Sequence, residues 1–357
     1  MLESHILIFA GYFFAALIFS VAINFLLLKF VKTLGIRNNG ETVIRWSATS
    51  KPALGGITFF IIFLLSFTSF SFLTGNGTEY FTFRTFGLLL AVAVGFLLGL
   101  FDDAYNTRPW IKFFTQVFCG IILIVSGIQI EFFANEWANY ALTIFWVVGI
   151  MNSINMLDNM DGITTIVSTG ILLGMLGILV FRQDFHNPMM VIIIGTLASL
   201  MGFLYFNWNP SKMFMGDTGS QFLGVLLAGL GIMFFWNGYG VTGEKNHVMQ
   251  VALVAMAFAL PLIDTTTVFI KRIARGSSPF VGGKDHTTHH LTYLGLSDRQ
   301  VALIFAGLSA VSAGFTIGIS TLIQSWSVLH AFLFGAYLLG LFLVLFMVAI
   351  CTRPASS

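Results

Sequence analysis

The chain has 357 residues, of which 57% are hydrophobic and only 9% charged, and its mean hydropathy is +0.90. A soluble domain carries about 25% charged residues, so this composition excludes an ordinary water-soluble protein and indicates one integral membrane domain, 1–357. The net charge of +2, without a dense basic run, excludes nucleic acid as the expected partner. Only two cysteines, Cys119 and Cys351, occur, which excludes a disulfide framework and a thiolate metal site.

The apolar runs predict an all-α protein with about 11 transmembrane helices, because a span needs about 20 mostly apolar residues. The first run, 5–31, is too long for the core of a signal peptide and is interpreted as a retained span. The expected spans are 5–31, 53–73, 84–101, 111–130, 140–157, 162–181, 188–207, 219–237, 247–271, 300–322 and 327–351.

The basic residues predict the orientation of these spans. With the N-terminus outside and the C-terminus cytoplasmic, 14 of the 17 Lys and Arg residues fall on the inner side, and only Arg84, Arg182 and Lys245 fall outside. This bias obeys the positive-inside rule. The same orientation gathers six aspartates at the cytoplasmic face: Asp102, Asp103, Asp158, Asp161, Asp217 and Asp285. The cytoplasmic loops 32–52, 102–111, 152–162, 208–219 and 272–299 are therefore the expected active site.

Asp102 and Asp103 end the third expected span. Adjacent carboxylates repel each other unless a cation lies between them or one is protonated, and acids at a helix C-terminus also oppose the helix dipole. Lys112, nine residues further on, is expected within reach of a bound phosphate, although a lysine that extends to the membrane boundary explains it equally well.

Four polar residues recur every three positions at the end of the fifth span: Asn152, Asn155, Asp158 and Asp161. Helix capping explains one such residue and not four, so they are expected to line a wet cavity. Asp217 lies in Gly216-Asp-Thr-Gly-Ser220, where a helix start is expected to present backbone N–H groups to an anion. An N-cap is the alternative for Asp217, and a metal ligand is favoured because the other acids lie on the same side.

The longest inner loop follows the ninth span and contains Arg272, His286, His289 and His290. Its basic residues and glycines suit phosphate binding, and the oxygen-rich surroundings favour Mg²⁺ or Mn²⁺ over zinc. Asp264 is an intramembrane acid and thus a candidate functional residue, with an ion pair to Arg272 or Lys271 as the structural alternative. Lys51 precedes Gly55-Gly56, which allows close approach of a ligand or of another helix.

The order of these motifs resembles the polyprenyl-phosphate N-acetylhexosamine-1-phosphate transferases. The matching motifs are Pro-x-x-Gly-Gly at 52–56, Asp-Asp at 102–103, Asn-Met-x-Asp-x-x-Asp-Gly at 155–162, Gly-Asp-x-Gly-Ser at 216–220 and the histidines at 286–290. The glycan-initiating branch usually has His-x-His-His, whereas this chain has Thr288 at the middle histidine position. The three consecutive histidines of the pentapeptide branch are absent as well.

The resemblance implies transfer of a sugar 1-phosphate, with GlcNAc preferred, from a UDP-sugar to undecaprenyl phosphate, with release of UMP at the bacterial inner membrane. It implies Mg²⁺ (or Mn²⁺) at Asp217 with Asp158, and catalytic roles for Asp102, Asp103, Asp158 and Asp161. Substrate contacts are expected from Lys51, Lys112, Asn152, Asn155, Asp264, Arg272, His286, His289 and His290. Related enzymes are often homodimers, so a dimer is a further expectation.

Several alternatives stay open at this level. Either Asp102 or Asp103 is the base that activates the lipid phosphate, and a covalent aspartyl intermediate is the alternative to direct attack. The rival functions are a phospho-MurNAc-pentapeptide transferase of the same family and a cation- or proton-coupled transporter. Transporters place their coupling acids near the bilayer midplane, whereas the acids here are expected at one face.

Overall fold

The computed structural model describes residues 2–30, 51–74, 81–278 and 283–352. These residues form helices, with one isolated bridge between Ala53 and Phe214 and no strand within the described ranges. The helices are α1 (Leu2–Phe30), α2 (Gly55–Thr74), α3 (Phe83–Tyr105), α4 (Pro109–Val125), α5 (Glu136–Leu157), α6 (Ile163–Phe181), α7 (Met189–Asn207), α8 (Gly216–Gly231), the π-helix η2 (Ile232–Trp236), α9 (His247–Ala257), α10 (Ala259–Ala274), α11 (Thr287–Tyr293), α12 (Asp298–Thr321) and α13 (Val328–Cys351). The expectation of an all-α chain is confirmed for the described residues.

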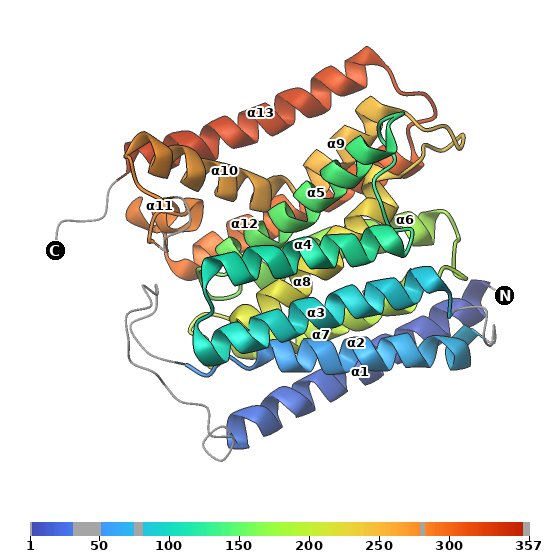
Figure 1. The fold of residues 1–357 in the computed structure, drawn as a ribbon, viewed down its shortest axis with the longest axis horizontal. Helices are drawn as coiled ribbons and strands as arrows, with labels where there is room; N and C mark the ends of the chain where they lie inside the picture. The colour runs from blue at the N-terminus through green and yellow to red at the C-terminus, as the bar shows by residue number, and fades with distance from the viewer. Residues whose placement is uncertain (1, 31–50, 75–80, 279–282, 353–357) are drawn as a thin grey trace.

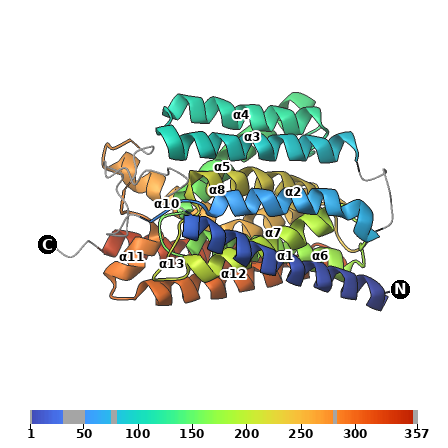
Figure 2. The same cartoon turned by 90° about the horizontal axis from the view of Figure 1, so that it is seen from below.

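Most helices run side by side along one direction, so that their ends gather at the two ends of a bundle (Figures 1 and 2). Among the described residues, eight helices are long and apolar enough to cross a membrane, and the bent pair α9–α10 makes a ninth. Two shorter apolar helices are α2, counted as Gly55–Ser69, and α4. The first helix begins at the end of the bundle opposite to that at which α13 ends (Figure 1).

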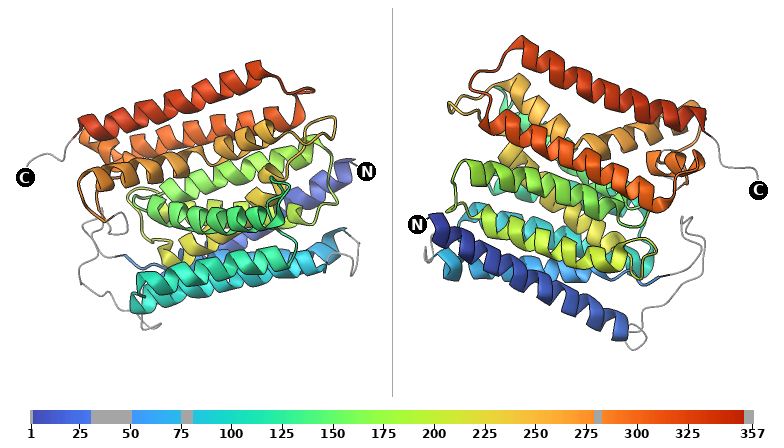
Figure 3. Two further views of the ribbon diagram at one scale, coloured as in Figure 1. Left: turned by 45° about the horizontal axis from the view of Figure 1, so that its top comes forward. Right: turned by 180° about the vertical axis from the view of Figure 1, so that it is seen from behind.

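The centre of the bundle is α8, which is buried from Thr218 to Gly231 and packs against α2, α3 and α5. By contrast, α1 and α13 lie at the periphery, as both faces of the bundle show (Figure 3). Small residues allow this central position. A Cβ atom added at Gly99 of α3 would lie 2.1 Å from the backbone oxygen of Asp217, and one added at Gly56 would lie 2.3 Å from the backbone nitrogen of Gly219.

The starts of α2 and α8 are joined through their backbones. The N–H groups of Leu54 and Gly55 donate to the Phe214 carbonyl over 3.1 and 3.2 Å, and the Phe214 N–H donates to the Pro52 carbonyl over 3.0 Å. These bonds satisfy N–H groups that would otherwise lack a partner at the first turn of α2. The segment that begins α8 is thus held on one side by α2 and on the other by α3.

The prediction that the ninth span is one helix over 247–271 is wrong. The span is broken at Phe258 into α9 and α10, which meet at 78°. Pro261 lies in the first turn of α10 and lacks the N–H that would bond back to the end of α9, which explains why the helix does not continue. The helix α11 inside the loop 272–299 was not expected at all. Residues 32–50 of the expected loop 32–52 lie outside the described residues.

Two helix boundaries differ from the expected spans in a way that changes the site. The helix α3 continues to Tyr105, so Asp102 and Asp103 lie in its last turn and not in a loop. The helix α8 begins at Gly216, so Asp217 lies in its first turn. Polar residues end an apolar run without ending a helix, and hydropathy alone therefore places these boundaries too early or too late.

Candidate active site

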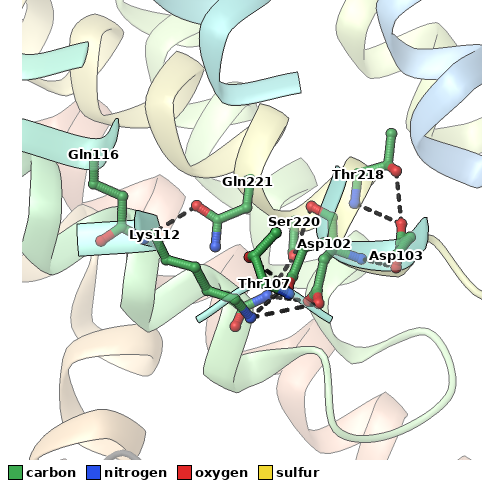
Figure 4. Close-up of polar contacts among 10 residues, drawn as sticks. Asp102, Asp103, Thr107, Lys112, Gln116, Thr218, Ser220 and Gln221 are labelled. Carbon is green, nitrogen blue, oxygen red and sulfur yellow. Dashed lines mark hydrogen bonds and ion pairs between the residues drawn. The ribbon is translucent and has the colours of Figure 1, made fainter. Parts of the chain in front are cut away.

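Three carboxylates and one ammonium group meet where α3 ends and α8 begins (Figure 4). We call the set Asp102, Asp103, Lys112, Asn155 and Asp217 the carboxylate site. Lys112 comes from the first turn of α4 and forms an ion pair with Asp102, and its Nζ lies 4.0 Å from Oδ2 of Asp217. The Lys112 side chain is 28% exposed and that of Asp217 36% exposed, so the site is open to a ligand.

The two adjacent aspartates do different things. Asp103 accepts the backbone N–H groups of Asp217 and Thr218 over 2.9 Å each, and the Thr218 hydroxyl over 2.6 Å. It therefore caps the first turn of α8 from another helix. The helix start does present these two N–H groups to an anion, and that anion is the Asp103 carboxylate of the protein itself.

Asp102 faces the other way, toward α4. Its Oδ1 accepts the backbone N–H and the hydroxyl of Thr107, each over 2.8 Å, and its Oδ2 meets Lys112. Asn106 turns the chain after α3 with a left-handed φ of 51°, which brings Thr107 back beneath the carboxylate. The side chain of Asp102 is held firmly in this way while its charge stays directed at Lys112 and Asp217.

Asn155, near the end of α5, orients the third carboxylate. Its Nδ2 donates to Oδ1 of Asp217 over 2.6 Å and to the Ser220 hydroxyl over 2.8 Å. Oδ2 of Asp217 is then the oxygen that faces Lys112. Asn152, one turn earlier on α5, does not contact these carboxylates in the recorded bonds; it donates to Gln116 of α4 over 2.8 Å.

The structure places Asp161 away from the carboxylate site. Its two oxygens accept the Ser211 N–H over 2.9 Å and the Ser211 hydroxyl over 2.7 Å, and Asn209 donates to it over 3.2 Å. Lys51 lies 3.7 Å from the same carboxylate and donates to the Ser211 hydroxyl over 2.9 Å. Asp161 and Lys51 thus hold the segment before α8 in place. Asp158 is the C-cap residue of α5.

A second polar group surrounds α11, and we call it the histidine cluster: Asp264, Lys271, Arg272, Asp285, His286, His289 and His290. Buried Asp264 contacts His286 Nδ1 over 2.8 Å and accepts the N–H and hydroxyl of Thr287 over 2.8 and 2.7 Å. The structural alternative that paired Asp264 with Arg272 or Lys271 is therefore wrong. Both cations lie on the same helix as Asp264, and that helix directs them to other partners.

Arg272 forms a two-pronged pair with Asp285, with nitrogen–oxygen distances of 2.9 and 2.6 Å. Burial opposes the charge on Asp285, but the hydrogen bonds and charge of Arg272 prevail and hold the pKa of that carboxyl below its usual value. Lys271 bonds to His290 Nε2 and donates to the Ala349 carbonyl over 2.7 Å. These contacts tie α10 and α11 to the end of α13.

Burial lowers the pKa of His289 to about 3, with repulsion from His286 as the second cause. Burial likewise lowers the pKa of His290 to about 4, and the charge of Lys271 adds to the effect. Both rings are therefore neutral at neutral pH. Thr288 donates to Asn159 over 2.6 Å and so joins α11 to the turn after α5.

The turn between α5 and α6 connects all of these groups. Asn155 reaches Asp217, Asn159 accepts from Thr288, and Asp161 holds Ser211. The spacing of polar residues in this segment had predicted one wet cavity. The structure instead distributes them over three neighbouring sets of contacts, all at the same end of the bundle.

Comparison with known sequences places these residues in a family. The model of glycosyl transferase family 4 matches residues 85–235, the stretch that contains Asp102, Lys112, Asn155 and Asp217. This stretch of the chain is similar to glycosyl transferase family 4. The match ends before α9, so the histidine cluster lies outside the matched stretch.

Three relatives illustrate the range of the family. A probable undecaprenyl-phosphate N-acetylglucosaminyl 1-phosphate transferase of Bacillus subtilis is 28% identical over 302 residues, covering 82% of this chain and 78% of the relative. A phospho-N-acetylmuramoyl-pentapeptide-transferase of Listeria monocytogenes is 28% identical over 286 residues, with 73% and 82% covered. A decaprenyl-phosphate N-acetylglucosaminephosphotransferase of Mycobacterium tuberculosis is 27% identical over 298 residues, with 75% and 73% covered.

Sequence reasoning missed several residues of the carboxylate site and its surroundings. Thr107 and Thr218 bind the two aspartates, and Gln116 and Gln221 lie one turn deeper in α4 and α8. An available signal was the presence of glutamine inside two otherwise apolar spans, because an uncompensated amide is costly in hydrocarbon. Among the described residues, no group of three or more His, Cys, Asp or Glu side chains is arranged to hold a metal ion.

Proposed function

We propose that this chain transfers N-acetylglucosamine 1-phosphate from UDP-GlcNAc to undecaprenyl phosphate and releases UMP. The observation that carries the proposal is the carboxylate site, in which two carboxylates share Lys112 at an open end of the helix bundle. The names of the Bacillus and Mycobacterium relatives, which specify a polyprenyl phosphate and an N-acetylglucosaminyl phosphate, support this choice of substrates.

The proposal includes a topology. If the two shorter helices α2 and α4 also cross, then together with the eight long helices and the bent pair they make eleven spans within the described residues. An odd number puts the termini on opposite sides, and the distribution of basic residues puts the carboxylate site in the cytoplasm. A nucleotide sugar then arrives from the aqueous side while the lipid phosphate is held at the membrane surface.

The reaction joins two anions, so the protein must reduce their repulsion. An oxygen of the lipid phosphate forms a bond to the β-phosphorus while the bond from that phosphorus to the bridging oxygen breaks, and UMP leaves with the electron pair. Lys112 supplies positive charge at this point. Of the two adjacent acids, Asp102 is the candidate base because it faces Lys112, whereas Asp103 is engaged with the start of α8.

The residues present fit a bound Mg²⁺ ion. Hard oxygen donors from Asp102 and Asp217 converge on the position near Lys112, and Mg²⁺ is usually held by one or two protein carboxylates together with substrate phosphates. Asp217 is the proposed ligand because Asn155 fixes its other oxygen. When bound there, Mg²⁺ supplies positive charge to the diphosphate oxygens. Asp158 remains the second proposed ligand.

The histidine cluster has a more limited role in this proposal. Asp264 holds Nδ1 of His286, which fixes the ring and leaves Nε2 as the nitrogen that a phosphate or sugar oxygen would meet. His290 bonds through both of its nitrogens, to Lys271 and to Thr352, so its role is to hold α11 and not to contact substrate. Arg272 and His289 are proposed to support the same segment.

The deciding experiment compares three donors with the purified protein and undecaprenyl phosphate: UDP-GlcNAc, UDP-GalNAc and UDP-MurNAc-pentapeptide. UMP release is expected with UDP-GlcNAc, and the Asp217→Asn protein is the inactive control. Release with the pentapeptide donor alone would assign the chain to the reaction named for the Listeria relative. No UMP from any donor, combined with cation-dependent flux in proteoliposomes, would favour the transporter alternative.

A further inference from the structure

Beneath the carboxylate site lies a layer of three amide side chains, Gln116, Asn152 and Gln221, which we call the amide layer. Asn152 Nδ2 donates to Gln116 Oε1 over 2.8 Å. Gln116 Nε2 donates in turn to Gln221 Oε1 over 3.2 Å, as Figure 4 shows. Gln116 is 1% exposed and Gln221 2% exposed. The three residues come from α4, α5 and α8, so the chain of bonds crosses two helix interfaces.

Each amide lies one helical turn from a member of the carboxylate site. Gln116 follows Lys112 by four residues, Gln221 follows Asp217 by four, and Asn152 precedes Asn155 by three. Residues three or four apart share a face of a helix. The contacts of the upper layer, Lys112 with Asp217 and Asn155 with Asp217, are thus repeated below by contacts between the same three helices.

The chemistry of the lower layer suits support rather than reaction. An amide donates and accepts, so three amides bond in a row without bringing a net charge that would compete for a cation or repel a phosphate. At this depth an amide without a partner is costly, which makes the arrangement selective for one relative position of the helices. The close contact of α5 with α8 reinforces it, since a Cβ atom at Gly224 would lie 2.7 Å from Met151 Cα.

We infer that the amide layer positions the ammonium group of Lys112 relative to Asp217, with Gln116 as the central positioning residue. The inference rests on the proposed function and extends it to residues that do not touch substrate. Among the interfaces of the site, the one between α3 and α8 is fixed by Asp103, and the one between α2 and α8 by backbone bonds. The amide layer joins α5 to α4 and α4 to α8.

The first test is the Gln116→Leu protein, because leucine is similar in size and neither donates nor accepts. The expected result is a fall in kcat for GlcNAc 1-phosphate transfer of about 10–100-fold, as for other residues that orient a catalytic group. The KM for UDP-GlcNAc should stay close to that of the wild type, since no ground-state contact with substrate is removed. A rise in KM by the same factor, with kcat unchanged, would overturn the inference.

A matched control is Gln250→Leu. Gln250 is also fully buried and bonds to another segment, the Gly238 carbonyl at 3.0 Å, but it lies at the opposite end of the bundle. Its replacement should lower the melting temperature without changing kcat relative to the amount of folded protein. If Gln250→Leu reduced kcat as much as Gln116→Leu, the effect would be one of general stability and the positioning role would be refuted.

The double variant Gln116→Leu/Gln221→Leu tests whether the two glutamines act together through their shared hydrogen bond or independently of each other. If the two act through one bond, the loss in the double variant is no larger than the greater single loss. Fully additive losses would contradict the inference. Where Gln116→Leu cannot be purified, Gln221→Leu removes the same bond from α8 and provides the same comparison with Gln250→Leu.

A readout independent of turnover keeps the inference distinct from the proposed function. The rate at which a water-soluble acylating reagent modifies the Lys112 amine, measured by mass spectrometry, should rise in Gln116→Leu and stay unchanged in Gln250→Leu. If the wild type releases no UMP, the proposed function fails while this labelling test still holds. Unchanged Lys112 labelling in Gln116→Leu would overturn the positioning role whatever the enzyme transfers.

Discussion

In the histidine cluster each charged group has a partner of its own: Arg272 pairs with Asp285, His286 with Asp264, and Lys271 with His290. In the carboxylate site, by contrast, Asp102 and Asp217 share Lys112, and both Lys112 and Asp217 are partly exposed. The two regions contain similar side chains at the same end of the bundle. A set of charges that is balanced within the protein stabilises a fold, whereas a set with excess negative charge suits the cation that we propose to bind there.

The largest loss of activity is expected on replacing Asp217, because the cation within its reach, Lys112, is shared with Asp102. Asp217→Asn should lower kcat by about 10²–10³-fold, because it removes the proposed metal ligand while Asn155 and Ser220 remain to hold the turn. UMP release and melting temperature are measured together, and the melting temperature should change little. Full turnover of the wild type in excess EDTA would refute the metal proposal.

Replacing Asp102 and Asp103 one at a time tests whether these two adjacent acids have different roles. Asp102→Asn should reduce turnover by about 10²-fold or more and regain part of it as the pH rises from 6 to 9.5, because lipid phosphate is already a dianion at high pH and needs less help from a base.

Asp103→Asn should instead lower stability by about 1–2 kcal/mol, since it weakens the cap of α8. Recovery at high pH in Asp103→Asn and not in Asp102→Asn would reverse the assignment. Trapping of a phosphorylated aspartate would favour the two-step route.

Substitutions in the histidine cluster should lower the stability of the protein more than its activity. Arg272→Met leaves Asp285 without its two-pronged partner and should lower the free energy of unfolding by about 1–3 kcal/mol. The double variant Arg272→Met/Asp285→Leu should recover most of this loss, because it removes the remaining charge as well. Thermal unfolding in detergent measures both. Loss of donor binding in Arg272→Met that the double variant does not restore would show that Arg272 contacts substrate.

The smallest effect is expected from acid. Neutral His290 accepts from Lys271 and donates from Nδ1 to the Thr352 hydroxyl over 2.6 Å, and that hydroxyl donates onward to the Val348 carbonyl. The pKa of His290 is lowered to about 4, against about 6.5 in an unfolded chain. Stability should therefore be complete above pH 6.5 and decline as the pH falls toward 4, because only the unfolded chain takes up the proton in that range.

Melting temperatures between pH 7.5 and 4.5 test this expectation. The decline should be shallower in His290→Gln, whereas His186→Gln, which changes an exposed histidine at the opposite end of the bundle, should follow the wild type. A decline of the same slope in His290→Gln would mean that other groups cause the loss of stability in acid.

The contrast between the regions also explains what could be predicted from the sequence. Hydropathy located the helices because each span is an apolar run of nearly fixed length, and the positions of Asp102, Asn155 and Asp217 near span ends indicated a site. Partners were harder to predict, because adjacent residues on a helix point in directions about 100° apart and only the packing decides which neighbour each one meets. For this reason the split roles of Asp102 and Asp103, the partners of Asp264 and the bend at Phe258 were not evident.

The cap that Asp103 places on α8 also determines which parts of the site can move. With Gly99 and Gly56 in backbone contact with the first turn of α8, the helices α2, α3 and α8 form a wall that has no room to rearrange. We expect any widening of the site to admit a bulky lipid phosphate to come from the opposite side, where side-chain bonds join α4 to α8 and α11 to the turn after α5. Substrate-induced protection from hydrogen exchange should accordingly be largest in those segments and smallest in α8.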